Sequence, residues 1–167
     1  EFAGDDRKAM DDYNAGIDID KNYVGLYMMR GRLRRKQGNM ELAKTDFEKV
    51  LELDTIADGG SSRHYALLFL DKKDEAVAWM DKIIETDKDN NGSYYDKACL
   101  LSLMGKPQDA IAALRVSLEK GYRSFIHIGR DSDLDSIRNL PEFIALIEEY
   151  KAKPKPVIEG IASEART

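Results

Sequence analysis

Residues that commonly carry catalysis or bind metals are scarce in this sequence of 167 residues. It holds one cysteine and two histidines, which excludes an internal disulfide and any metal site built from several cysteines. The two histidines show no H-E-x-x-H or similar spacing. Glycine-rich phosphate-binding loops and the nucleophile motif G-x-S-x-G are absent as well. The sequence therefore predicts that the chain is not an enzyme and holds no metal or cofactor.

Long hydrophobic runs and an excess of positive charge are also absent. The longest apolar runs, such as residues 65–70, are far too short to cross a bilayer as a helix. The net charge is −5, whereas a general nucleic-acid-binding protein would normally be basic. We therefore expect a soluble, helix-rich protein with no membrane span and no nucleic-acid partner. The compartment, cytoplasmic or bacterial periplasmic, stays open.

A repeated pattern of small and bulky residues runs through most of the chain. Four alanines follow one another at intervals of 34, 33 and 34 residues: Ala9, Ala43, Ala76 and Ala110. A bulky residue stands four positions after each alanine: Tyr13, Phe47, Met80 and Leu114. A residue typical of turns stands five positions before it: Gly4, Gly38, Asp71 and Gly105. Self-similarity at this period indicates an array of helical repeats, each a pair of antiparallel helices.

One copy of the pattern, residues 24–57, resembles the tetratricopeptide repeat closely. Counted from its start, positions 4, 8, 20 and 24 hold the aromatic and small residues typical of that family: Tyr27, Gly31, Ala43 and Phe47. Small residues let two helices approach closely, and bulky residues fill the gaps between them. Positions 7 and 11, usually Leu and Tyr, are Arg30 and Arg34 instead, and Thr55 replaces the usual proline.

The resemblance implies an all-α fold, a right-handed α-solenoid of about three and a half repeats over residues 1–121, with the first repeat incomplete. We expect its helices at the following ranges: 5–20, 23–37 paired with 39–53, 62–70 paired with 72–86, and 91–104 paired with 107–120. Residues 122–152 resemble the segment that ends bacterial tetratricopeptide arrays, with a Gly-Tyr, a D-x-D-L-x-x-I-R motif and a P-x-F motif. They are expected to form a helical cap. Residues 153–167 are expected to be a linker or tail.

Eight apolar residues of the expected cap are predicted to cover the exposed face of the last repeat. They are Phe125, Ile126, Ile128, Leu134, Ile137, Phe143, Ile144 and Ile147.

Residues 30–36 form a basic run in an otherwise acidic chain. The resemblance places this run on the kind of helix that lines the concave groove, with Arg32, Arg35 and Lys36 directed toward a ligand. Guanidinium groups suit carboxylate or phosphate recognition because they offer paired, planar donors. The alternative is a solvated face whose charges pair with the acidic residues of helix 5–20.

Three further residues complete the predicted groove. The resemblance places Tyr65 and Tyr95 at groove positions, where a ring with a polar tip offers a large contact area, although packing between helices is the alternative. Met28 and Arg32 stand where relatives that clamp a chaperone's C-terminal carboxylate carry Lys and Asn, which argues against that ligand. Cys99 is interpreted as a packing thiol, since the sequence offers no base to activate it.

The resemblance implies a protein–protein interaction module that binds a peptide or partner domain, acidic ones included, in its concave groove. The alternative is a structural or regulatory spacer of a larger multidomain protein, whose catalytic part lies outside this chain and whose other domains are its partners. The incomplete first repeat and the proline-containing tail favour the alternative.

Overall fold

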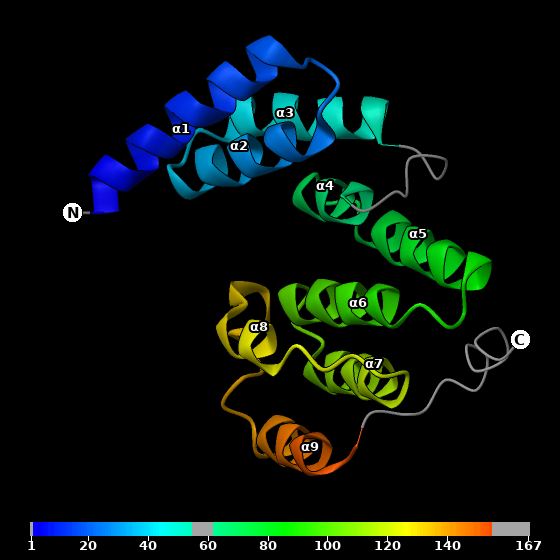
Figure 1. Ribbon diagram of the computed structural model, residues 1–167. Coiled ribbons are helices and arrows are strands. Elements are labelled where there is room, and N and C mark those ends of the chain that lie inside the picture. The colour runs from blue at the N-terminus through cyan, green and yellow to red at the C-terminus, as the bar shows by residue number, and fades with distance from the viewer. Residues whose placement is uncertain (1, 55–61, 155–167) are drawn as a thin grey trace, which may run out of the picture. The chain divides into compact units, whose positions relative to one another are not determined.

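The computed structural model describes residues 2–54 and 62–154, and every regular element in that part of the chain is a helix (Figure 1). The all-α class predicted from the sequence is therefore confirmed. Internal contacts divide the chain into two compact units, Glu1–Ile83 and Ile84–Thr167. Within residues 2–54 and 62–154, no helix has the length and hydropathy that a membrane crossing needs. Thr55 and the predicted tail from residue 155 onward lie outside the described residues.

The first unit contains the helices expected from residues 5–86, with bounds that differ from the prediction by only a few residues. They are α1 (Phe2–Ile19), α2 (Val24–Lys36), α3 (Met40–Leu53), α4 (Arg63–Phe69) and most of α5 (Lys73–Thr86). The turn residues of the repeat pattern explain where the first helix of a pair ends. Gly38 has a φ of +79° and Asp71 a φ of +61°, a left-handed conformation that glycine adopts without strain and aspartate tolerates.

Helices α2 and α3 form the pair of the best-matching repeat. A Cβ atom on Gly31 would lie only 2.6 Å from the Phe47 ring, so this position must stay small for the helices to approach. Ala43 and Phe47 are each 1% exposed, and Val50 is fully buried. The predicted roles of the small and bulky residues of this repeat are therefore confirmed.

The core of the first unit extends from the α2–α3 pair to both neighbours. Ile17 of α1 and Ala66 of α4 join it, together with Tyr27 and Met28 of α2. Helix α4 packs on α3, where the rings of Phe47 and Phe69 lie 5.1 Å apart. Further along the chain, the Arg63 guanidinium of α4 lies over the Trp79 ring of α5 at 4.8 Å. The short helix α4 is therefore held mainly by its packing.

The second unit begins with the pair predicted at 91–104 and 107–120. Its helices are α6 (Asn91–Leu103), α7 (Pro107–Glu119), α8 (Phe125–Arg130) and α9 (Pro141–Ala152), with a 3-10 turn, η2 (Ser132–Leu134), between α8 and α9. The Asn90 side chain caps α6 by accepting the amides of Gly92 and Ser93. Helix α6 packs on α7 and on η2, and α9 packs on α7 (Figure 1).

Of the eight apolar residues predicted to form the cap, five are buried in this unit, Phe125 is half-buried and two are exposed. Leu134 and Ile137 are fully buried, whereas Ile126 and Ile144 are 74% and 51% exposed. The prediction was wrong for these two because each lies on the outward face of its helix. The cap sequence has no regular repeat that would reveal which face points inward. Ile128, two residues after Ile126, points inward instead and is 1% exposed.

Candidate functional site

The basic run of α2 divides between two faces of the helix. Two residues that stand two positions apart on an α-helix are related by a rotation of about 200° about its axis, so they point to nearly opposite sides. Arg30 and Arg34 turn toward α3, where both contact Asp46. Arg32 and Arg35 turn toward α4, where both lie over aromatic rings. The run therefore contains two separate arrangements of charge.

A buried carboxylate on α3 explains why arginines stand at two positions where the family usually has Leu and Tyr. Asp46 is 1% exposed, and it accepts Arg30 Nη2 at 2.7 Å and Arg34 Nη1 at 2.8 Å. Arg30 also donates from Nη1 to the Asn14 side chain of α1 at 2.8 Å. This cluster joins α1, α2 and α3 through charge-assisted hydrogen bonds.

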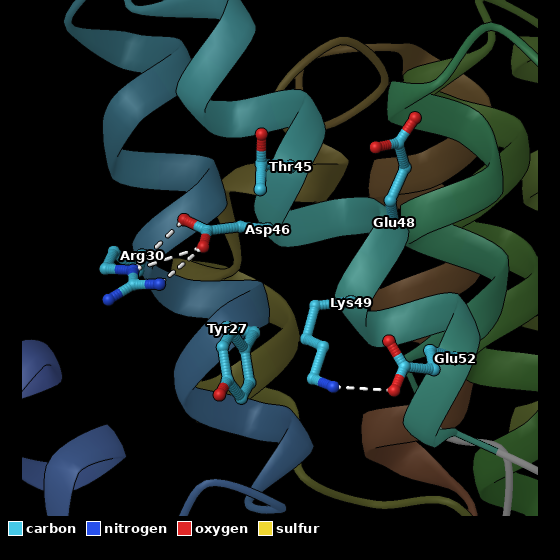
Figure 2. A pocket seen from close by; sticks show the side chains of 7 residues that line it. All are labelled: Tyr27, Arg30, Thr45, Asp46, Glu48, Lys49 and Glu52. Carbon is cyan, nitrogen blue, oxygen red and sulfur yellow. Dashed lines mark hydrogen bonds and ion pairs between the residues drawn. The ribbon is translucent and has the colours of Figure 1, made fainter.

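A shallow recess of about 420 Å³ opens beside this cluster, between α2 and α3 (Figure 2). It is lined by Tyr27, Arg30, Thr45, Asp46, Glu48, Lys49 and Glu52. Its polar side chains already engage protein groups: Arg30 bonds Asp46, and Lys49 Nζ lies 2.6 Å from Glu52 Oε1. Thr45 donates to the Glu41 carbonyl at 3.1 Å. The recess is therefore better explained as part of the structural ion-pair cluster than as a ligand site.

The opposite face of the run carries what we call the arginine–aromatic surface, formed by Arg32, Arg35, Tyr65 and Phe69. The Arg32 guanidinium lies 5.5 Å from the centre of the Tyr65 ring and 5.6 Å from that of Phe69. The Arg35 guanidinium lies 4.7 Å from the centre of the Phe69 ring, and its side chain is exposed. Such stacking holds a guanidinium plane in place while its edge can still donate hydrogen bonds.

Three of the six predicted groove residues thus come together: Arg32, Arg35 and Tyr65. Phe69 was missed, although its place four residues after Tyr65 on the same helix was a usable signal. Lys36 instead pairs with Asp6 of α1 at 2.9 Å. This is the alternative given for the basic run in the sequence analysis, in which its charges pair with acidic residues of the first helix. Met28 is 5% exposed and packs in the core of the first unit.

The sixth predicted residue, Tyr95, belongs to a polar cluster in the second unit. Its hydroxyl donates to Asp131 Oδ2 at 2.7 Å, and its ring stacks on Tyr122 with the ring centres 4.5 Å apart. The Cys99 thiol and His127 Nε2 each lie 3.6 Å from the same Asp131 oxygen. Asp131 therefore attaches α8 and η2 to α6.

Burial shapes the protonation of this cluster. It raises the pKa of the Tyr95 hydroxyl and of the Cys99 thiol far above their ordinary values, so both stay protonated as donors. A buried, protonated thiol is a poor nucleophile. Burial, together with the Asp131 charge, also raises the pKa of Asp96 to about 6. Among the residues that the structure describes, no group of three or more His, Cys, Asp or Glu side chains could hold a metal ion.

One short segment of the chain matches a known family, and longer stretches are similar to individual proteins. The family model for the tetratricopeptide repeat matches residues 24–55. A chloroplast protein from Arabidopsis thaliana is 27% identical in an alignment 82 residues long that covers 47% of this chain and 24% of that protein. This chain therefore spans about a quarter of that relative's length.

Two solved structures are also similar to the chain. MamA is 22% identical, with 90% of this chain and 85% of that chain covered and a TM-score of 0.42. YrrB, described as a TPR protein with an unusual peptide-binding site, is 14% identical, with 89% and 77% covered and a TM-score of 0.40.

The matched segment coincides with α2, α3 and their close approach at Gly31, which is the packing the repeat requires. A repeat of this kind supports protein–protein interaction in general. Residues 24–55 therefore form a segment that matches the tetratricopeptide repeat, and the match supports the family resemblance of the chain.

Proposed function

We propose that the chain binds an acidic peptide segment, or a free carboxylate of a partner protein, at the arginine–aromatic surface of α2 and α4. The observation that carries the proposal is the pair of guanidinium groups held over the rings of one short helix. In a chain with a net charge of −5, these two cations are turned away from the buried carboxylate that engages their neighbours on α2.

Stacking favours this function for a physical reason. An arginine that is already ordered loses less conformational entropy when a ligand arrives, so more of the interaction energy is left for binding. Its planar edge matches the two oxygens of a carboxylate. The Tyr65 and Phe69 rings add an apolar contact that does not depend on charge. An acidic side chain flanked by an apolar one is therefore the ligand that this surface fits.

Lys36 extends the same surface. Its present partner, Asp6, gives an ion pair whose side chains are 63% and 29% exposed, and such pairs contribute little to stability. A ligand carboxylate can replace Asp6 at small cost. Met28, which is buried, would influence binding through the packing of α2 rather than by direct contact.

The test compares two double variants with the same change in charge. Arg32→Glu/Arg35→Glu alters the surface, whereas Lys44→Glu/Lys73→Glu alters side chains of α3 and α5 that are 59% and 57% exposed. Binding is measured on an array of acidic, neutral and basic peptides, with free and amidated C-termini, at about 50 and about 300 mM salt. The wild type and the control should retain acidic peptides, more weakly at the higher salt.

The surface variant should lose about tenfold in affinity, which corresponds to about 1.4 kcal/mol. Tyr65→Ala should weaken binding at both salt concentrations, since an aromatic contact is not screened. Tyr95→Ala belongs in the same panel as a test of the sixth predicted residue. Equal binding by all variants would place the binding site elsewhere. If the wild type retains no peptide at all, the spacer function is favoured instead.

A further inference from the structure

Helix α4, which supplies both rings of the arginine–aromatic surface, contains a buried histidine. His64 is 1% exposed, and neither ring nitrogen has a hydrogen-bond partner among the described residues. It stands at a position that the tetratricopeptide pattern keeps small, in a helix of only seven residues. Its neighbour in the chain, Tyr65, lies under Arg32. The imidazole is therefore part of the packing that places the binding surface.

The neutral form of His64 is strongly favoured in this position. Burial lowers its pKa from 6.5 to about 3, because a charged imidazole would lose its hydration without gaining a partner. Among the described residues, the charged and titratable groups of the elements around it include Arg63 and Tyr65 on α4, Asp54 after α3, and Arg32 and Arg35 on α2. Arg63 and Asp54 bond to backbone groups, and the buried residues of α5, Ala76 and Met80, carry no charge.

We propose that His64 makes α4 an acid-sensitive latch: on mild acidification its imidazole takes up a proton only by leaving the core, and α4 with its two rings leaves with it. A seven-residue helix cannot persist in water without packing, so loss of the His64 contacts is loss of the helix. The proposal deepens the proposed function, because the open form lacks the aromatic rings on which Arg32 and Arg35 stack.

The size of the effect follows from proton linkage. In the open form His64 titrates at its ordinary pKa of 6.5, whereas in the closed form it stays neutral throughout mild acid. Above that pKa neither form binds the proton, and opening is independent of pH. Between about pH 7.5 and about pH 5.5, the ratio of open to closed α4 should rise about tenfold.

Amide hydrogen exchange of the whole chain measures this ratio directly, after correction for the pH dependence of intrinsic exchange rates. The amides of α4 should open about tenfold more often at about pH 5.5 than at about pH 7.5, with those of α3 as the internal reference. His64→Leu and His64→Met, two neutral side chains of similar size, should abolish the rise. His127→Gln, which removes the second histidine, 55% exposed, should keep it. A pH-independent α4 in the wild type, or a rise that survives in both His64 variants, would overturn the proposal.

A second arm separates the latch from the proposed function. An acidic peptide that binds at about pH 7.5 should protect α4 from exchange at about pH 5.5, where carboxylates of ordinary pKa remain ionised. A peptide that binds but leaves α4 exchange unchanged refutes the link between latch and binding surface. If no peptide binds at either pH, the proposed function fails, and the exchange of the free protein alone decides the role of His64.

Discussion

Replacing Asp46 by asparagine should destabilise the first unit severely. Asparagine keeps the shape of the side chain and removes its charge, so the Arg30 and Arg34 guanidinium groups would face each other without a counter-ion. Both are largely buried, with side chains 15% and 18% exposed. The change therefore isolates the electrostatic role of one carboxylate.

The contacts set the magnitude of this loss. Asp46 accepts Arg30 Nη2 at 2.7 Å, Arg30 Nε at 3.2 Å and Arg34 Nη1 at 2.8 Å. Removing one partner of a buried ion pair costs about 3–5 kcal/mol, since the remaining charge stays uncompensated. The remaining exposure of both arginines lets water offset part of that cost. We therefore expect a loss of about 3 kcal/mol in the free energy of unfolding.

Urea unfolding followed by tryptophan fluorescence measures this, because Trp79 is the single tryptophan and lies in the first unit. Glu48→Gln is the matched control: it neutralises a carboxylate of the same helix that is 56% exposed, and should change stability by less than about 0.5 kcal/mol.

A triple variant completes the experiment. Arg30→Leu/Arg34→Tyr/Asp46→Ala gives the two α2 positions the residues usual in the family and removes all three charges together. It should recover most of the stability lost in Asp46→Asn, because replacing a whole buried ion cluster by apolar groups is often neutral. A loss below about 1 kcal/mol for Asp46→Asn, or a triple variant less stable than that single one, would refute the argument.

Four other substitutions test the packing and the second unit. Gly31→Ala should cost about 1–3 kcal/mol in urea unfolding, because its Cβ would lie 2.6 Å from the Phe47 ring. Ala110→Leu should overpack the α6–α7 pair by a similar amount, and an unchanged melting temperature by circular dichroism would mean that the repeat register is wrong. Tyr95→Phe should loosen α8 and η2 by about 1–2 kcal/mol, seen as faster amide exchange there. Asp96, whose pKa is raised to about 6 in the folded state from 3.8, should stabilise the second unit as pH falls from about 7 to about 4, by up to about 3 kcal/mol, and Asp96→Asn should remove this pH dependence of α6 exchange.

The repeated pairs were predictable because their pattern is local. The spacing of Ala43 and Phe47 against Gly31 encodes which helix faces meet, and each copy of the pattern carries the same information again. The cap lacks that redundancy, so its sequence does not reveal which face of each helix points inward, and the prediction is wrong for Ile126 and Ile144. The contact between Tyr95 and Asp131 spans 36 residues, and no periodicity relates them.

For the candidate site, too, positions within the repeat could be predicted, whereas contacts with a second helix could not. Arg32, Arg35 and Tyr65 were predicted from their positions in the repeat, which fix the face each side chain occupies. Whether the arginines meet solvent, a carboxylate or a ring depends on a second helix, and the sequence of α2 alone does not contain that. Asp46 was missed for this reason: its role is set by two arginines that stand 16 and 12 residues before it on another helix.

The orientation of Arg32 and Arg35 depends on the contacts of the other two arginines of α2, Arg30 and Arg34. Arg30 and Arg34 are one turn apart and are fixed to α3 by Asp46, while Arg30 also holds Asn14 of α1. These bonds set the rotation of α2 about its axis. That rotation in turn decides where Arg32 and Arg35 point, because they share the same rigid backbone. The buried cluster thus orients the arginine–aromatic surface from the opposite face of the helix. Burying these charges costs desolvation free energy. The cluster instead gives the two guanidinium groups of that surface a fixed direction.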